Sequence, residues 1–254
     1  MIKNKTKRAI IILKEEGIYT LVKKIFKYLL NKFQFFLFPY FLFKIKKFDS
    51  DGIKESIEFV FNKLPLIKPF QIREEISQLL QILKEREPKF ILEIGTEGGG
   101  TLFLFSRVAS DDAKIISIDL PGGKFGGGYP EWKIPIYKAF VKGNQKIYLL
   151  RKDSHEEETL EEVKKILNGN QLDFLFIDGD HTYEGVKRDF KMYNSLVKKG
   201  GIISFHDIVP GPKENVGGVP KFWEEIKRNF QIQEIVKNWN QNGYGLGVIF
   251  KFKL

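Results

Sequence analysis

The residues best suited to chemistry follow two apolar runs, Phe174–Ile177 and Ile202–Phe205. Such runs read as buried strands of a parallel sheet, and ligands bind in the crevice outside the carboxyl ends of these strands. We therefore expect the polar residues that follow the two runs to meet at one edge of the sheet. These residues are Asp178, Asp180, His181, His206 and Asp207.

Acidic side chains at neighbouring strand ends repel one another unless they share a cation. A divalent metal ion is therefore one explanation for the pairing of Asp178 with His206-Asp207. The alternative is that His206 hydrogen-bonds Asp178 without a metal. Both explanations predict that the three side chains lie close together.

A glycine-rich turn follows another apolar run, Phe90–Ile94. It reads Glu93-Ile-Gly95-Thr96-Glu97-Gly98-Gly99-Gly100-Thr101 and leads into a helical stretch. Glycines allow a sharp turn and a close approach of the backbone to a ligand. A dinucleotide would place its pyrophosphate near Glu93, where a carboxylate is unfavourable, whereas a cationic cofactor tolerates it. Glu93 could instead be a structural acid that caps the loop.

Asp119 ends the next apolar run, 26 residues after Glu93. At this place a carboxylate can accept hydrogen bonds from the hydroxyl groups of a ribose. Asp153 and Ser154 follow the third run, Ile147–Leu150. They are candidates for contact with a base, although Asp and Ser are also favoured helix N-caps.

The segment Leu92–Thr101 resembles motif I of the catechol and caffeoyl-CoA O-methyltransferases. The resemblance implies S-adenosylmethionine as the cofactor, with Asp119 as the ribose-binding acid and Asp153-Ser154 near adenine. The residues that it assigns to the cofactor are Glu93, Gly95, Thr96, Gly99, Thr101, Asp119, Leu120, Asp153 and Ser154.

The second site resembles the metal-dependent branch of these enzymes. The resemblance implies that Asp178, His206 and Asp207 hold Mg²⁺ and that His181, three residues after the first acid, is the general base. His206 stands where an acid is usual in the family. An imidazole ligand also admits Mn²⁺ or Fe²⁺.

The segments Ile177–Gly185 and Asp119–Pro130 are more similar to cephalosporin-hydroxylase-like enzymes, which include antibiotic-tailoring and sugar O-methyltransferases. Loop 121–130 contains five glycines and is interpreted as a mobile lid. Tyr129 and Trp132 are candidates for stacking on a sugar face. An irregular surface loop is the alternative interpretation.

The fold that positions these residues is predicted from alternating strands and helices. Apolar runs Phe90–Ile94, Ile115–Asp119, Ile147–Leu150, Phe174–Ile177 and Ile202–Phe205 alternate with helical stretches, including one near Glu156 and one over Tyr183–Lys198. Alternation predicts a Rossmann-like α/β fold with five parallel strands. After a helix around Phe222–Phe230, the segments Gln231–Lys237 and Leu246–Phe252 flank an Asn/Gly turn, which predicts an antiparallel hairpin.

The net charge of +10 lies entirely in residues 1–48, which carry twelve basic and two acidic residues. Residues 49–254 carry equal numbers of basic and acidic residues, so a nucleic-acid partner is not indicated. The chain contains no cysteine, which excludes disulfides and thiolate chemistry. We expect two parts, residues 1–48 and a catalytic domain over 49–254.

The N-terminal part combines apolar residues at helical spacing with lysines and the aromatic run Phe35–Phe43. The run is too short to span a bilayer. A basic amphipathic segment is typical of helices that lie on an anionic membrane surface. Packing on the catalytic domain or on a second copy of the chain is the alternative.

The sequence thus predicts a metal-assisted, S-adenosylmethionine-dependent O-methyltransferase acting on a hydroxyl group, with a sugar or glycan as the favoured acceptor. We expect it in the cytoplasm, peripherally attached to the membrane, and possible as a homo-oligomer. The alternatives are an NAD-dependent oxidoreductase and a non-catalytic cofactor-binding scaffold. The acids Glu93, Asp119, Asp178 and Asp207 argue against both.

Overall fold

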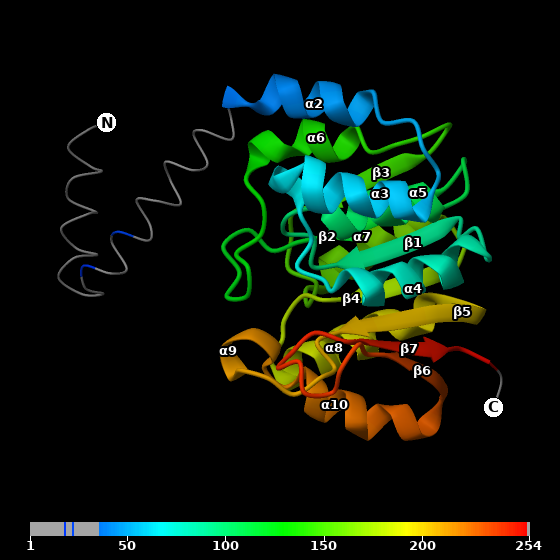
Figure 1. Ribbon diagram of the computed structural model, residues 1–254. Helices are drawn as coiled ribbons and strands as arrows, with labels where there is room; N and C mark the ends of the chain where they lie inside the picture. The colour runs from blue at the N-terminus through cyan, green and yellow to red at the C-terminus, as the bar shows by residue number, and fades with distance from the viewer. Residues whose placement is uncertain (1–17, 19–21, 23–35, 253–254) are drawn as a thin grey trace, which may run out of the picture. The chain divides into compact units, whose positions relative to one another are not determined.

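The computed structural model describes residues 18, 22 and 36–252 (Figure 1). The chain divides into two compact units, Met1–Lys44 and Ile45–Leu254. Helix α2 (Phe38–Lys46) crosses this division. Most of the N-terminal amphipathic pattern lies outside the described residues, so the predicted division at residue 48 stays a prediction.

The second unit is built on one seven-stranded sheet with the order β3-β2-β1-β4-β5-β7-β6. The first five strands are parallel, as predicted, and β7 pairs antiparallel with both β5 and β6. The bounds are β1 Phe90–Ile94, β2 Lys114–Ile118, β3 Lys146–Leu150, β4 Leu172–Ile177, β5 Val197–His206, β6 Gln231–Ile235 and β7 Leu246–Phe250. The Rossmann-like prediction is confirmed.

Helices cover both faces of the sheet (Figure 1). They are α3 (Ile53–Glu58), α4 (Arg73–Lys84), α5 (Gly100–Val108), α6 (Ile134–Lys138), α7 (Glu157–Leu167), α8 (Tyr183–Tyr193), α9 (Lys213–Val216) and α10 (Val219–Ile226). On one face, α7, α8 and α10 bury a continuous apolar core against the strands. On the other face, Phe105 of α5 packs on Phe174 and Phe176 of β4. Burial on both faces explains why the central strands are apolar throughout.

The helix predicted over Tyr183–Lys198 ends earlier, at Tyr193. Asn194–Leu196 form a 3-10 turn, and Val197 already belongs to β5, where it pairs with Leu172. Val197 and Lys198, which were predicted as the end of the helix, therefore belong to the sheet. The predicted hairpin is present as β6 and β7, joined by loop 236–245.

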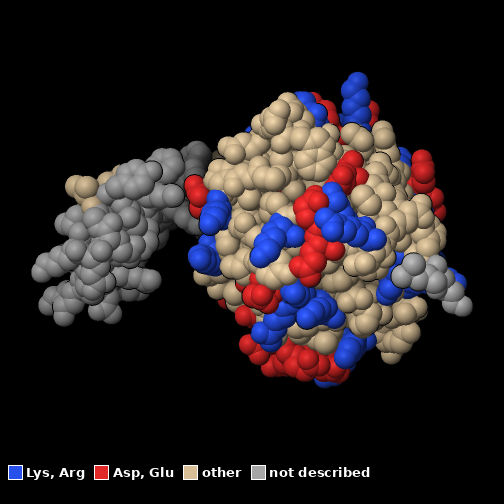
Figure 2. Space-filling view, turned by 90° about the horizontal axis from the view of Figure 1, so that it is seen from below, with Lys and Arg blue, Asp and Glu red and all other residues tan. Residues whose placement is uncertain are grey.

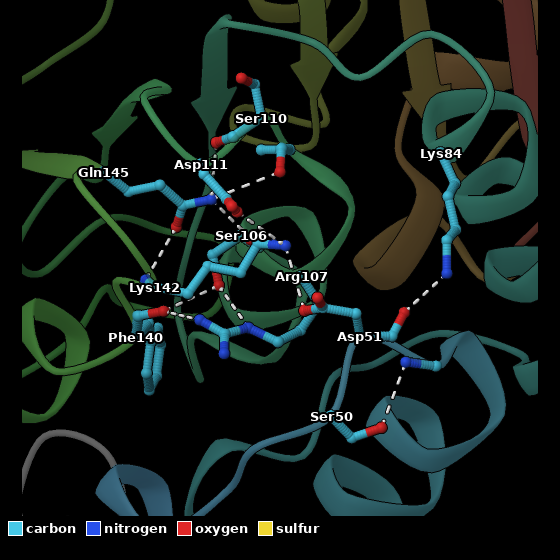
Figure 3. Close-up of polar contacts among 12 residues, drawn as sticks. Ser50, Asp51, Lys84, Ser106, Arg107, Ser110, Asp111, Phe140, Lys142 and Gln145 are labelled. Atoms are coloured by element: carbon cyan, nitrogen blue, oxygen red, sulfur yellow. Dashed lines mark hydrogen bonds and ion pairs between the residues drawn. The ribbon is translucent and has the colours of Figure 1, made fainter.

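A polar network fixes the segment that enters α3 (Figure 3). The ammonium of Lys142 lies 3.0 Å from an oxygen of Asp51 and 3.2 Å from one of Asp111. Lys84 donates to the carbonyl oxygen of Asp51 at 2.8 Å. These contacts tie the segment before α3 to α4 and to the loop before β2.

Beside this network, the buried guanidinium of Arg107 donates to the carbonyl oxygen of Phe140 (Figure 3). The amide of Gln145 donates to the carbonyl oxygens of Ser106 at 2.9 Å and Ser110 at 3.0 Å. Because each donor satisfies a main-chain carbonyl at a helix end or turn, the network closes the C-terminal end of α5.

Figure 2 views the molecule from the side of α10 and shows basic and acidic side chains interspersed on the described part of this face. This agrees with the balanced charge of residues 49–254. Within the described part of the chain, no helix combines the length and the apolarity needed to cross a bilayer.

Candidate active site

A cleft of about 680 Å³ opens at the carboxyl edge of the parallel strands. This volume lies within the usual range for a small-molecule site. The turns after β1, β2, β3, β4 and β5 all contribute to it, as the sequence predicted. Every residue proposed for cofactor or metal except Glu93 lines the cleft, and Glu93 is buried directly behind the glycine-rich turn.

Two glycines of the turn after β1 are required by their geometry. Gly95 has a φ of +90°, and a Cβ there would lie 2.0 Å from the carbonyl oxygen of Asp178. Gly99 has a φ of +85°, and its Cβ would lie 2.5 Å from the ring of Tyr137. Left-handed backbone and lack of space together exclude a side chain at either position.

Glu93 is completely buried, and burial raises its pKa to about 8 although hydrogen bonds from Thr101 and Thr96 act against this. The hydroxyl of Thr96 donates to the Glu93 carboxylate at 2.9 Å. A largely protonated acid at neutral pH becomes ionised when a cation binds beside it. Glu93 is therefore suited to respond to a cationic ligand.

Asp119 follows β2 and is also buried, which raises its pKa to about 6. Its Oδ2 accepts from the backbone amides of Thr96 at 3.2 Å and Glu97 at 2.5 Å. The acid thus holds the glycine-rich turn in place. Leu120 beside it lines the cleft and is partly exposed.

Asp153 and Ser154 line the far end of the cleft. Asp153 accepts from the backbone amide of His155 at 2.8 Å, whereas α7 has Glu156 at its N-cap. Asp153 therefore caps the turn before the helix and not the helix itself. His155 also lines the cleft, and its Nε2 lies 3.3 Å from the completely buried carboxylate of Asp189.

The structure brings Asp178, His181, His206 and Asp207 together. Asp178 Oδ1 lies 3.1 Å from His206 Nδ1 and 3.3 Å from His181 Nε2. Asp207 lies 3.4 Å from His181 Nδ1 and 3.7 Å from His206 Nδ1. Asp180 is turned away from this cluster, since it accepts from the backbone amide of Thr182 at the start of α8.

The cluster favours positive charge. Burial alone would raise the pKa of Asp178, but His206 and His181 lower it to about 2. Burial alone would lower the pKa of His181, but Asp178 and Asp207 raise it to about 9. Burial also acts to lower the pKa of His206, and the same two acids raise it. In the metal-free protein, imidazolium groups therefore balance the two carboxylates.

The donor set fits a divalent cation. One ligand atom each from Asp178, His181 and Asp207 lie within 4.8 Å of one another. His206 Nε2 is buried without a hydrogen-bond partner among the described residues. Carboxylate and imidazole ligands of this kind suit Mg²⁺, Mn²⁺ or Fe²⁺. The structure thus adds His181 to the residues that could serve as ligands.

Loop 121–130 folds over the cleft and places Phe125 on the chemical site. The ring of Phe125 stacks on His181, with centroids 4.9 Å apart and planes at 19°. Tyr129 packs edge-on against Tyr137, and neither Tyr129 nor Trp132 is among the described residues that line the cleft. The expectation that these two aromatics face a sugar is therefore wrong in this conformation, because Tyr129 is used in the core.

Two further residues that line the cleft belong to no motif recognised in the sequence. Gln71, before α4, donates to Asp178 Oδ2 at 3.4 Å. Tyr244 in loop 236–245 donates its backbone amide to Asp207 Oδ1 at 2.9 Å. Both come from segments far from the motifs in sequence, so only the tertiary fold reveals them.

Comparison with known families agrees with this site. Residues 92–208 match the family model described as "Methyltransferase domain". This part of the chain is therefore similar to methyltransferase domains. The match runs from β1 to the residue after Asp207, so the matched region includes every candidate site residue predicted from the sequence.

Two relatives share part of the chain. Protein R132 of Acanthamoeba polyphaga mimivirus, described as uncharacterized, is 31% identical over 140 residues, which cover 55% of this chain and 61% of R132. Protein y4gI of Sinorhizobium fredii, also uncharacterized, is 29% identical over 176 residues, which cover 64% of this chain and 17% of y4gI. The chain thus spans less than two thirds of either relative.

Solved structures of similar fold include the O-methyltransferase TomG of Streptomyces achromogenes in complex with SAM, with 15% identity and a TM-score of 0.55 over 82% of this chain and 92% of TomG. A putative O-methyltransferase from Klebsiella pneumoniae has 16% identity and a TM-score of 0.53 over 82% and 93%. At this identity the likeness confirms the Rossmann-like fold.

Proposed function

We propose that the protein is an S-adenosylmethionine-dependent O-methyltransferase. The observation that carries the proposal is the pair of buried acids, Glu93 and Asp119, beside a glycine-rich turn that admits no side chain at Gly95 or Gly99. This arrangement suits a cofactor with a cationic amino-acid end and a ribose. The SAM bound in the TomG structure supports the same cofactor.

Each predicted cofactor residue has a place in this proposal. Glu93, Thr96 and Thr101 bind the amino-acid end beside Gly95 and Gly99, and Asp119 with Leu120 contacts the ribose. Asp153 and Ser154 contact the adenine. A carboxylate that accepts from ribose hydroxyls forms charge-assisted hydrogen bonds, which are stronger than neutral ones.

Asp178, His206 and Asp207 would hold a divalent metal ion, which would lower the pKa of an acceptor hydroxyl. S-Adenosylmethionine supplies the methyl group. The carboxylates of Asp178 and Asp207 both face Nδ1 of His206, which supports this ligand set.

His181 is the proposed general base. Its Nδ1 donates to the carbonyl oxygen of Asn215, and its Nε2 lies 3.3 Å from Asp178 Oδ1. Because Asp178 and Asp207 raise the pKa of His181 to about 9 in the metal-free protein, the proposal requires that a bound metal ion draws their charge, so that Nε2 can receive a proton. In the proposed reaction the acceptor hydroxyl gives its proton to Nε2, and its oxygen forms the new bond to the methyl carbon. The methyl–sulfur bond breaks, and its electron pair stays on sulfur. Phe125 over the imidazole keeps water from this side of the site.

A sugar or glycan hydroxyl is the proposed acceptor. The aromatic residues Phe125 and Tyr244 and the amide residue Asn242 are among those that line the cleft. Sugars are commonly bound through such a combination of ring faces and hydrogen-bonding groups. A small phenol would use the same surface, and an acceptor screen distinguishes the two.

We further propose peripheral attachment to the cytoplasmic face of a membrane through residues 1–48. Phe36, Tyr40 and Phe43 recur at helical spacing and are 81%, 51% and 60% exposed. Lys44, Lys46 and Lys47 follow directly. Exposed aromatics beside lysines are typical of interfacial helices.

Calorimetric titration of the full-length protein tests the proposed cofactor. S-Adenosylhomocysteine, the demethylated product, should bind in the micromolar range or tighter, and NAD should show no heat of binding at the same concentration. Binding of NAD alone would replace the proposal with a dehydrogenase.

A further inference from the structure

Loop 236–245 forms one wall of the cleft with an unusual backbone. Four consecutive residues have positive φ, namely Asn242 at 64°, Gly243 at 115°, Tyr244 at 61° and Gly245 at 82°. Asn242, Gly243 and Tyr244 line the cleft. A left-handed backbone is unfavourable at non-glycine residues, so this conformation needs contacts that hold it.

Glu75 of α4 supplies these contacts. Its side chain is completely buried. Its Oε1 accepts from the backbone amide of Lys237 at 2.9 Å and from the side chain of Gln241 at 2.8 Å, and its Oε2 accepts from the backbone amide of Gly245 at 3.0 Å. The carboxylate therefore joins both ends of the loop.

The loop in turn fixes Asp207. The amide of Tyr244 donates to Asp207 Oδ1, and the carbonyl oxygen of Tyr244 accepts from Val209 at 2.9 Å. Asp207 itself has a φ of 60°. With Oδ1 held by the loop, Oδ2 faces His181. A displacement of the loop would free the carboxylate to rotate.

We propose that Glu75 is a positioning residue that holds loop 236–245 in place, and through it the Asp207 carboxylate and the Tyr244 wall of the acceptor site. The part concerning the acceptor rests on the proposed function. Glu75 touches neither the cofactor turn nor the candidate base, so its effect is confined to the acceptor and metal side of the cleft.

The test compares Glu75→Gln with Glu74→Gln in the full-length protein. Glutamine has the same shape as glutamate, but its side chain carries an NH₂ group in place of one carboxylate oxygen. This NH₂ group would face the donors that the carboxylate oxygen now accepts from. Glu74 is the matched control, because it contacts the same loop through the side chain of Lys237 at 2.8 Å and is exposed.

Hydrogen exchange is the first measurement. The amides of Lys237, Tyr244 and Gly245 should exchange at least tenfold faster in Glu75→Gln than in the wild type, with β1 and α5 unchanged. Glu74→Gln should exchange like the wild type. Equal exchange in Glu75→Gln would overturn the proposal, whatever the enzyme's function.

Ligand binding separates positioning from general stabilisation. Mn²⁺ affinity, measured without cofactor or acceptor, should fall at least fivefold in Glu75→Gln, while affinity for S-adenosylhomocysteine should stay within twofold. An equal loss of both would show a merely structural role and overturn the proposal. If the wild type binds neither ligand, the proposed function fails, whereas the exchange experiment still decides the role of Glu75.

Should Glu75→Gln fail to fold, Gln241→Ala provides a milder variant. It removes one donor to Glu75 and leaves the carboxylate and both backbone donors in place. Exchange at Lys237 and Gly245 should rise about threefold or more. Wild-type exchange in this variant, with wild-type Mn²⁺ affinity, would contradict the proposal.

Discussion

The imidazole of His155, which lines the cleft, lies next to the buried carboxylate of Asp189, with Nε2 and Oδ1 3.3 Å apart. The nearby carboxylate of Asp189 raises the pKa of His155 above 6.5, and burial raises the pKa of Asp189 above 3.8. A raised histidine pKa contributes stability that is full below pH 6.5 and is lost as pH rises through the folded pKa. The raised pKa of Asp189 likewise makes the folded protein less stable as the pH rises.

Asp189→Asn should therefore lower the pKa of His155 toward 6.5 and weaken the fall in unfolding free energy between pH 6 and pH 9. The histidine ring protons, followed by NMR, report the pKa directly, and the chain has only three histidines to assign. Urea unfolding at several pH values measures the stability. An unchanged His155 titration would show that the pair does not form in solution.

Asp119→Asn should weaken the binding of S-adenosylhomocysteine at least tenfold. The variant replaces charge-assisted hydrogen bonds to the ribose, typically worth about 1.5–3 kcal/mol each, with neutral ones. Calorimetry measures the affinity. Asp112→Asn is the control, because Asp112 is an exposed acid just before β2 that pairs with Lys89. Comparable affinity of the two variants would place the ribose elsewhere.

Binding of S-adenosylhomocysteine at pH 7 should release close to one proton. Burial raises the pKa of Glu93 to about 8, so the acid is mostly protonated in the free protein and ionises beside the cationic amine of the ligand. The same raised pKa means that the free protein loses stability as pH rises from 4.5 toward 8.

Titrations in buffers of different ionisation enthalpy count the released protons. Glu93→Gln should release few or none. If the wild type and this variant release equal numbers, the proton comes from another group and Glu93 does not contact the amine.

His181→Ala should lower turnover by about 10²–10⁴ at neutral pH, the usual contribution of a general base. Because Asp178, His206 and Asp207 remain, its affinity for Mn²⁺ should stay within threefold of the wild type. His206→Ala should instead weaken Mn²⁺ binding at least tenfold, and excess chelator should abolish wild-type turnover.

Mn²⁺ binding followed by electron paramagnetic resonance distinguishes the two histidines. A large loss of affinity in His181→Ala, with little loss in His206→Ala, would make His181 the metal ligand. Full turnover of the wild type in excess chelator would show that the reaction needs no metal ion.

The full-length protein should sediment with anionic liposomes at low salt, and a protein that starts at Ser50 should not. Each basic residue near an anionic surface contributes about 1 kcal/mol, and salt screens this attraction. Replacing Lys44, Lys46 and Lys47 by Gln in the full chain should reduce sedimentation while keeping the aromatic residues. Equal sedimentation of the long and short proteins would assign residues 1–48 to packing or dimerisation.

The residues that line the cleft at the strand ends could be predicted from the sequence, because they directly follow the apolar runs that form the strands. Phe90–Ile94 was predicted with the bounds that β1 has, and Asp178 and His206-Asp207 meet as the strand order requires. Local pattern suffices here, since a parallel sheet places all carboxyl ends at one edge.

Contacts made across long sequence separations were not predictable in this way. Gln71 and Tyr244 reach Asp178 and Asp207 from segments without a recognisable motif. One signal was present for Glu75, because it lies on the same face of its helix as Leu79 and Leu83, which are buried. A charged residue on an apolar helix face indicates a buried acceptor, but its donors are known only from the fold.

The contact between Gly95 and the main chain of Asp178 leaves no room for even a methyl group. In the proposed enzyme, the turn that carries the methyl donor and the strand end that faces the acceptor therefore rest directly on each other. Loops 121–130 and 236–245 lie outside this contact, and residues of both loops line the cleft. The position of the methyl donor is thus fixed by the backbone, whereas the choice of acceptor substrate depends on loop residues. The choice of acceptor is therefore the property most open to evolutionary change or redesign.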